Sequence, residues 1–270
     1  DFAAQVGILC DYPNRFDAEL DVWHGRIARL SEEGVFEGTQ YAHTPLDFVY
    51  PSQDWSRYSL LFYPHPAIMT REIADRLERY VREGGKLVLG CRVGYKEEYG
   101  KCPVGRILPG LLPFVGAEVR ESTFVNPDGG GICMKETYSA EAFRELLEPK
   151  EAKSIGYHDG VAFNRECAAT ERNYGKGTVV LYGSTLGADV VRHLLEKYRL
   201  SEPYGDVVKL PQEVELAGRG KYLFLLNYAD YLVCGEALRP LRNAETGERT
   251  LGMLRFFPFE VKIFLLEAQR

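Results

Sequence analysis

The chain has 270 residues, of which 45% are hydrophobic and 27% are charged, as in an ordinary globular protein with a substantial core. Its net charge of −6 is spread along the chain without a basic patch, so nucleic acid is not an expected partner. No apolar run reaches the roughly 18 residues that span a bilayer, so no membrane role is expected.

The six cysteines include no close pair such as CxxC, and a chain of this length does not depend on disulfides. We therefore expect free thiols and a cytoplasmic location. The five histidines form neither an HxH nor an HExxH motif, so neither a metal nor another cofactor is predicted. The first residue is aspartate and no signal-peptide pattern follows, so we expect a processed protein, a protein cleaved from a tag, or a fragment of a longer polypeptide.

The first ninety residues alternate short apolar runs with amphipathic patterns. Buried strands are predicted at 6–10, 46–50, 59–63 and 86–90. A helix is predicted over 17–33, ending near Gly34, with a weaker helical stretch after it; its apolar face would carry Leu20, Trp23, Ile27 and Leu30. Strands alternating with helices are typical of a parallel sheet with helices on both faces.

The clearest predicted helix follows the third strand. Thr70 can cap its N-terminus, and the pair Gly84–Gly85 can end it because glycine tolerates the left-handed conformation. The sequence thus predicts an α/β fold, with a parallel sheet flanked by helices.

The middle of the chain shows weaker patterns. A helical candidate spans 104–115, and a glycine-rich turn is expected at 128–131. From residue 150 the chain is rich in strand patterns, and 173–177 predicts a hairpin turn leading into a strand at 178–183. A helix over 187–199 would close this first domain.

The pattern changes near residue 203. Strands are expected at 214–216, 222–227, 250–251 and 259–266, separated by glycine, asparagine and proline turns. We therefore predict two domains, an α/β domain over 1–202 and a small antiparallel β domain over 203–270.

Cys91 is the one candidate nucleophile. It follows the predicted fourth strand, and ligands in open α/β folds bind beyond the carboxyl ends of strands. A reactive cysteine at such a turn needs a helix N-terminus or a basic neighbour to lower its pKa. No strong helix pattern and no suitably placed histidine follow Cys91, so the residues disfavour this role.

The chain resembles the region that follows the catalytic barrel in bacterial β-galactosidases of glycoside hydrolase family 42. The resemblance rests on the order and spacing of eight short segments rather than on any one of them. These segments are VGILCDY (6–12), PLDFVYP (45–51), EGGKLV (83–88), RVGYKEE (92–98), LPGLL (108–112), LLEP (146–149), NYGKG (173–177) and GKYLFLLN (220–227).

The resemblance implies a flavodoxin-like, class I glutamine amidotransferase-like domain that lacks catalysis and serves in trimerisation, followed by a small β domain. It implies two partners: further copies of the same chain, which form a homotrimer, and a barrel domain of the parent chain. The loop residues Arg92, Gly94, Lys96, Glu97 and Glu98 would then lie at an interface, unless the loop is simply solvated.

Catalysis would lie outside these residues. A retaining glycosidase needs two carboxylates about 5–5.5 Å apart, and a (β/α)₈ barrel takes about 250 residues. No glutamate of this chain is therefore carried over as catalytic, and a terminal β-galactoside would be a substrate only of the parent enzyme.

Two other functions stay open at this point. One is a stand-alone amidotransferase-like enzyme that uses Cys91 as its nucleophile. The other is a carbohydrate-binding or purely structural module, to which Trp23, Trp55 and the many tyrosines could contribute.

Overall fold

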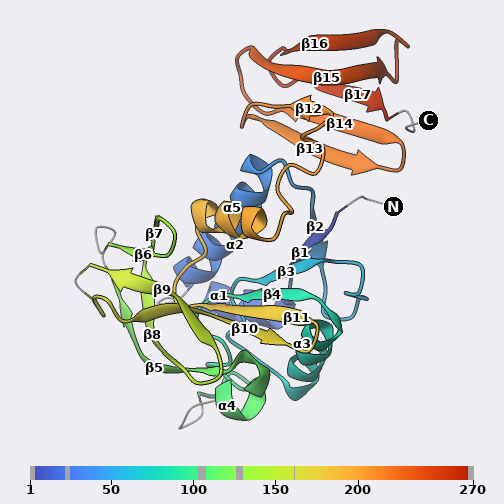
Figure 1. Cartoon of the computed structure of the whole chain (residues 1–270). Helices are drawn as coiled ribbons and strands as arrows, with labels where there is room; N and C mark the ends of the chain where they lie inside the picture. Colours follow the sequence, from blue (N-terminus) through green and yellow to red (C-terminus); the bar gives the residue numbers. More distant parts are fainter. Residues whose placement is uncertain (1–3, 22–24, 103–107, 126–129, 161, 267–270) are drawn as a thin grey trace. The chain divides into compact units, whose positions relative to one another are not determined.

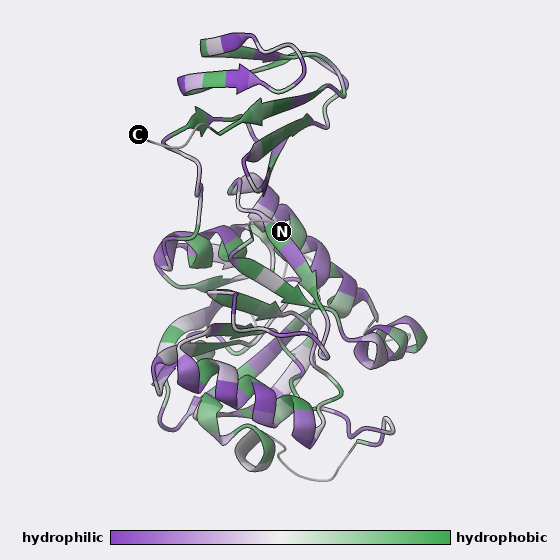
Figure 2. Cartoon of the chain, turned by 90° about the vertical axis from the view of Figure 1, so that its right-hand side faces the viewer, coloured by the Kyte–Doolittle hydropathy of each residue, from purple (hydrophilic) through white to green (hydrophobic). Residues whose placement is uncertain are grey.

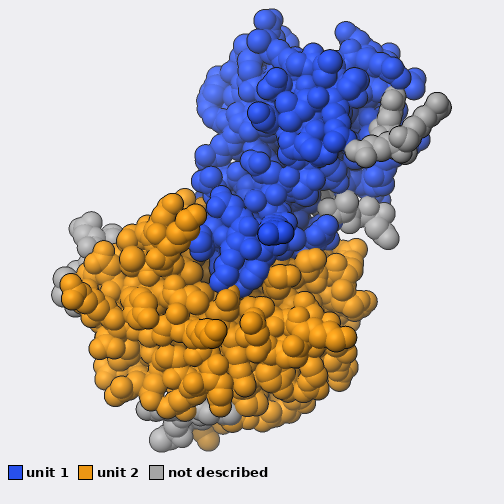
Figure 3. Space-filling view, in the orientation of Figure 1, with its two compact units in different colours: residues 1–6, 36–47, 191–270 blue, residues 7–35, 48–190 orange. Residues whose placement is uncertain are grey.

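The computed structural model describes residues 4–21, 25–102, 108–125, 130–160 and 162–266 (Figure 1). Two compact units are distinguished, one comprising 1–6, 36–47 and 191–270 and the other 7–35 and 48–190 (Figure 3). Within the described ranges, no helix has the length and apolar character needed to cross a membrane.

A nine-stranded sheet forms the centre of the α/β region. Its strands lie in the order β2 (Leu46–Val49), β1 (Val6–Leu9), β3 (Leu60–Tyr63), β4 (Lys86–Leu89), β11 (Gly177–Tyr182), β10 (Cys167–Tyr174), β9 (Lys153–Asp159), β6 (Gly131–Cys133) and β7 (Thr137–Ser139). All four strands predicted in the first ninety residues are confirmed. Every residue of β1 and β3 is buried, as expected for strands covered on both faces.

The sheet is mixed, whereas the sequence predicted a parallel one. β4 pairs in parallel with β3 and with β11, but β10 pairs antiparallel with both β11 and β9. The reversal comes from the predicted hairpin, in which Gly175 has φ +59°. Because a tight turn replaces a crossover helix there, the chain returns antiparallel. β5 (Ala117–Phe124) and β8 (Phe143–Pro149) form a separate two-stranded sheet.

Helical segments lie between the strands along the chain. They are α1 (Tyr12–Leu20), α2 (Gly25–Tyr41), α3 (Arg71–Glu83), α4 (Leu108–Leu111), the 3₁₀ turn η1 (Pro113–Val115) and α5 (Ala188–Lys197). The prediction for α3 is confirmed at both ends: Thr70 Oγ1 accepts a hydrogen bond from the N–H of Ile73 at 3.3 Å, and Gly84 has φ +126°. Figure 2 shows hydrophobic residues concentrated in the strands, with hydrophilic residues along the helices.

The helix predicted over 17–33 is confirmed as helical at 17–20 and 25–33, but it is not one helix ending near Gly34. The chain forms two helices instead: α1 ends at Leu20, which is 82% exposed rather than buried, and α2 continues past Gly34 to Tyr41. Gly34 lies inside α2, where the absence of a side chain allows close packing. A Cβ at this position would lie 1.9 Å from the carbonyl oxygen of Leu186, so only glycine permits this close approach.

Three predictions fall partly outside the described residues. They concern Trp23, residues 104–107 of the helical candidate, and residues 128–129 of the glycine-rich turn. The remainder of the helical candidate contains the short helix α4 and the turn η1, and Gly131 begins β6.

The second sheet is antiparallel and six-stranded. Its strands are β12 (Val208–Lys209), β15 (Val233–Asn243), β17 (Val261–Leu265), β14 (Tyr222–Asn227) and β13 (Val214–Arg219), with β16 (Arg249–Phe256) paired to β15. The four predicted strands are confirmed. The longest strand, β15, was missed because it contains Pro240, beside a register shift between Ala237 and Leu241 that accommodates the proline.

Candidate functional site

Cys91 lies at the end of β4 and is fully buried. Burial, followed by the charge of Glu145, raises its pKa well above the ordinary value for a thiol. A nucleophilic cysteine needs solvent access and a lowered pKa. Cys91 is buried instead of accessible to solvent, and its pKa is raised instead of lowered.

The first residues of the loop after Cys91 are buried in the fold. Arg92 has φ +65° and is 2% exposed, and its backbone N–H donates to Glu145 Oε1 at 2.8 Å. Its guanidinium lies 4.3 Å from the ring centroid of Tyr95, and its Nη1 lies 3.6 Å from Asp21 Oδ2. Gly94 is also buried, with φ +63°, and its N–H donates to the carbonyl of Pro66. The loop therefore docks on the fold through its own backbone.

Lys96 connects this loop to α1. Its Nζ lies 2.8 Å from both carboxylate oxygens of Asp17 and 3.3 Å from Asp21 Oδ2. Burial lowers the pKa of Lys96, but the two aspartates outweigh burial and the net pKa is raised. Glu97 and Glu98, the last two residues of the predicted interface, are exposed.

The inner face of α1 is held by further polar contacts. Asn14 Nδ2 donates to Asp11 Oδ2 at 2.8 Å and to the carbonyl of Ile68 at 2.9 Å. Asn14 Oδ1 accepts from the N–H of Ile68 at 2.6 Å, and the Tyr63 hydroxyl donates to Asp11 Oδ2 at 2.6 Å. These groups are buried and satisfy one another, so they fix the position of the helix.

The outer face of α1 is apolar and open. Tyr12, Phe16 and Leu20 recur every four residues and are 52%, 57% and 82% exposed. The Tyr12 ring stacks on Phe16 at 5.9 Å and on Tyr50 at 5.6 Å between centroids. Phe48, on the edge strand β2, lines the same small pocket as Tyr12 and Tyr50. We call Tyr12, Phe16, Leu20, Phe48 and Tyr50 the α1 stripe.

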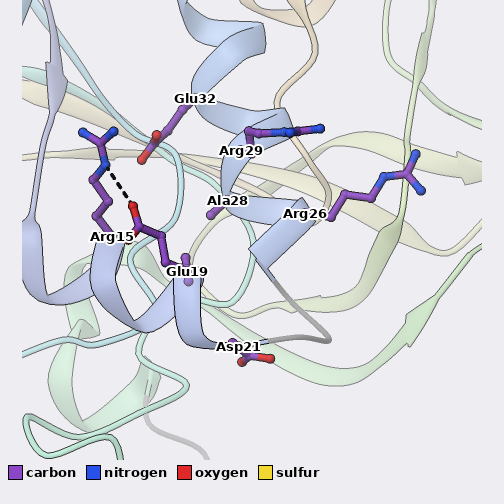
Figure 4. A pocket seen from close by; sticks show the side chains of 8 residues that line it. Arg15, Glu19, Asp21, Arg26, Ala28, Arg29 and Glu32 are labelled. Atoms are coloured by element: carbon purple, nitrogen blue, oxygen red, sulfur yellow. Dashed lines mark ion pairs between the residues drawn. The ribbon is translucent and has the colours of Figure 1, made fainter.

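Charged side chains border the α1 stripe. A cleft of about 560 Å³ lies between α1 and α2, and Figure 4 shows Glu32 of α2 extending toward Arg15 of α1, whereas Arg29 points away from α1. Arg15 and Glu19 form an ion pair of 3.7 Å. Both signs of charge are present, so the cleft does not select an anion or a cation.

A buried polar cluster lies behind the loop, on β8 and β9. Burial raises the pKa of Glu145 to about 7, although the Arg92 amide and guanidinium act in the opposite direction. His158 Nε2 lies 2.8 Å from the Glu145 carbonyl oxygen, and Arg144 donates to the carbonyls of Asp159 and Ala162. These contacts are internal, and they join the loop to the strands beneath it.

Trp55, considered above as a sugar platform, is part of the core. It is 4% exposed, packs edge-on against Tyr80 at 6.5 Å, and donates its indole N–H to the carbonyl of Tyr50. Its ring is thus not available to stack on a sugar.

Sequence reasoning missed most of this site. Of the α1 stripe, only Leu20 was named, and it was expected to be buried. The anchors Asp11 and Asn14 were not singled out, although a polar pair spaced by three residues directly after a strand could have indicated them. No sequence signal connects Glu145 with Arg92, which lies 53 residues away.

The fold is an α/β domain followed by an antiparallel β domain, and comparison with known proteins specifies its class. Residues 4–202 match the family described as the β-galactosidase trimerisation domain. The chain belongs to this family.

Two curated relatives are β-galactosidases. BgaA of Clostridium cellulovorans is 27% identical over 227 residues, and LacZ of Heyndrickxia coagulans is 24% identical over 273 residues. These matches cover 81% and 97% of this chain, but the chain spans only 32% and 41% of the two relatives. The crystal structure of a β-galactosidase from Bacillus circulans sp. alkalophilus has the same fold, with a TM-score of 0.86 and 18% identity, covering 98% of this chain and 41% of that one.

Proposed function

We propose that this chain is the non-catalytic assembly portion of a β-galactosidase-type glycoside hydrolase and that it associates as a homotrimer. The observation that carries the proposal is the match of residues 4–202 to the trimerisation family. The buried, weakly acidic Cys91 thiol supports it, because a stand-alone thiol enzyme needs the opposite environment.

In this proposal the bond-breaking chemistry belongs to another part of the parent chain. The relatives are more than twice as long as the segment that matches, which leaves room for a (β/α)₈ barrel of about 250 residues. The parent enzyme would hydrolyse terminal β-galactosides with retention, using two facing carboxylates of that barrel. The barrel is then a partner of the present chain, and the galactoside is bound only by the parent enzyme.

Three finer features belong to the same proposal. The α/β domain has an amidotransferase-like, flavodoxin-like topology and ends near residue 202, where the family match also ends. The loop with Arg92, Gly94, Lys96, Glu97 and Glu98 contributes to the assembly, with Glu97 and Glu98 as its exposed part. The protein works in a reducing compartment such as the cytoplasm, in keeping with its six free cysteines.

The experiment is to purify the 270-residue chain, measure its mass by light scattering during gel filtration, and assay it with nitrophenyl β-galactoside. We expect three times the monomer mass of 30.6 kDa and no turnover. Robust hydrolysis by the pure chain would refute the assignment of catalysis to another domain. A monomer at every concentration would refute self-association.

A further inference from the structure

We infer that the α1 stripe, Tyr12, Phe16, Leu20, Phe48 and Tyr50, is a contact surface for a second copy of this chain. The inference rests on the proposed self-association and goes beyond it by naming the surface. It depends on how α1 is oriented.

The helix α1 is oriented with its polar side inward. A surface helix normally buries an apolar stripe and turns its polar face to water. In α1 the buried positions hold Asn14 and Ala18, while the helix presents Tyr12, Phe16 and Leu20 outward. Buried polar networks and ion pairs hold it in this orientation at a desolvation cost that an apolar contact would not incur. The outward face is therefore built into the fold, and it is not the result of a loosely attached segment.

The exposed apolar area suits a protein partner. The stripe is continuous, because Tyr12 stacks on both Phe16 and Tyr50. Aromatic side chains offer about 150–250 Å² each, so five half-exposed residues present on the order of 500 Å². This is the size of the largest apolar patch on a typical monomer, about 300–600 Å², and such a patch is often functional. A stable interface buries roughly 800 Å² per partner, with an apolar centre and a polar border.

The charged side chains next to the α1 stripe favour another copy of this chain over a strongly charged partner. Arg15 and Glu19 of α1, and Arg29 and Glu32 of α2, supply both signs of charge around the cleft. A border of mixed sign can meet a different, equally mixed surface of a neighbouring copy without net repulsion. The strand β2, which carries Phe48, is the last strand of the nine-stranded sheet, so this edge can also meet a neighbour.

The test compares the double variant Phe16→Lys/Leu20→Lys with a matched control, Phe257→Lys/Leu251→Lys. The control residues are 63% and 64% exposed and lie in the β domain. The lysine at position 20, the last residue of α1, complements the helix dipole, and both lysines face water in the monomer, so the stripe variant should fold. Circular dichroism and the thermal midpoint check this point, and Phe16→Ala provides a milder change.

We expect the stripe variant to show a threefold lower mass than wild type in sedimentation at micromolar concentration, while the control stays a trimer. A folded stripe variant that remains trimeric would overturn the inference and leave the proposed self-association intact. Loss of the trimer in the control but not in the stripe variant would also overturn it. A wild-type chain that is itself monomeric contradicts both proposals.

Discussion

At the scale of single residues, burial in the fold raises the pH at which Glu145 loses its proton. Its carboxyl is buried and accepts the N–H of Arg92, and its pKa rises from 4.5 to about 7. The folded state therefore holds this proton more tightly than the unfolded state. Stability contributed by Glu145 is lost as the pH rises from about 4.5 to about 7. The shift corresponds to about 3 kcal/mol.

The variant Glu145→Gln should remove this loss, because an amide does not ionise and its oxygen can still accept the Arg92 N–H. We expect the free energy of unfolding of wild type to fall by about 3 kcal/mol more than that of the variant between pH 4.5 and 8. Burial lowers the pKa of His158, which gives an opposite slope, but this contribution cancels in the difference. If urea titrations gave the same pH dependence of the free energy of unfolding for wild type and Glu145→Gln, the result would contradict the assignment.

At the scale of elements, the position of α1 depends on Lys96. Its ammonium pairs with both Asp17 and Asp21, and Asp21 also lies 3.6 Å from Arg92 Nη1. The side chains of Lys96, Asp17 and Asp21 are only 12–17% exposed. Replacing one partner in a buried ion pair leaves charges unpaired, which costs more than the pair contributes.

The variant Lys96→Met should lower the free energy of unfolding by about 2–3 kcal/mol, whereas the same change at the exposed Lys101 should have little effect. Adding Asp17→Asn to Lys96→Met should recover part of the loss, since the uncompensated Asp17 charge is then gone while Asp21 keeps its ion pair with Arg92. Urea unfolding at a fixed protein concentration provides the measurement. An additive decline in the double variant Lys96→Met/Asp17→Asn would show that Lys96 acts through packing alone.

Different elements differ in how far their sequence predicts them. The strands β1, β3 and β4 follow from short apolar runs between turn residues, because both faces of a central strand are covered. The cap at Thr70 and the ending at Gly84 place α3 within a residue. β15 escaped prediction because a strand with a proline and a register shift loses its alternation.

Helix α1 could not be predicted by the same reasoning. Periodicity assigns the apolar face of a helix to the core, and this assumption placed Leu20 inside. In the fold, polar groups distant in sequence hold the helix instead: Asn14 contacts Tyr63 and Ile68, and Asp17 contacts Lys96. Long-range polar pairing leaves no periodic signal. The departure from the usual pattern occurs at the surface that we propose for assembly.

At the scale of the whole molecule, the account combines three observations. The chain belongs to a trimerisation family, spans less than half of the length of its β-galactosidase relatives, and exposes an apolar stripe on a rigidly held helix. A closed ring of three copies uses a contact in which each copy presents one surface to a different surface of the next. The α1 stripe would be one of these two surfaces.

Photo-crosslinking from position 16 tests this claim most directly. Phe16 is replaced by the photoreactive analogue benzoylphenylalanine, which is similarly apolar, and Phe257 is replaced in the same way as a control. After irradiation at micromolar concentration, the account predicts covalent species of two and three chains on a denaturing gel from position 16 and a single chain from position 257. A single-chain band from position 16, in a sample whose mass is that of a trimer, would contradict it.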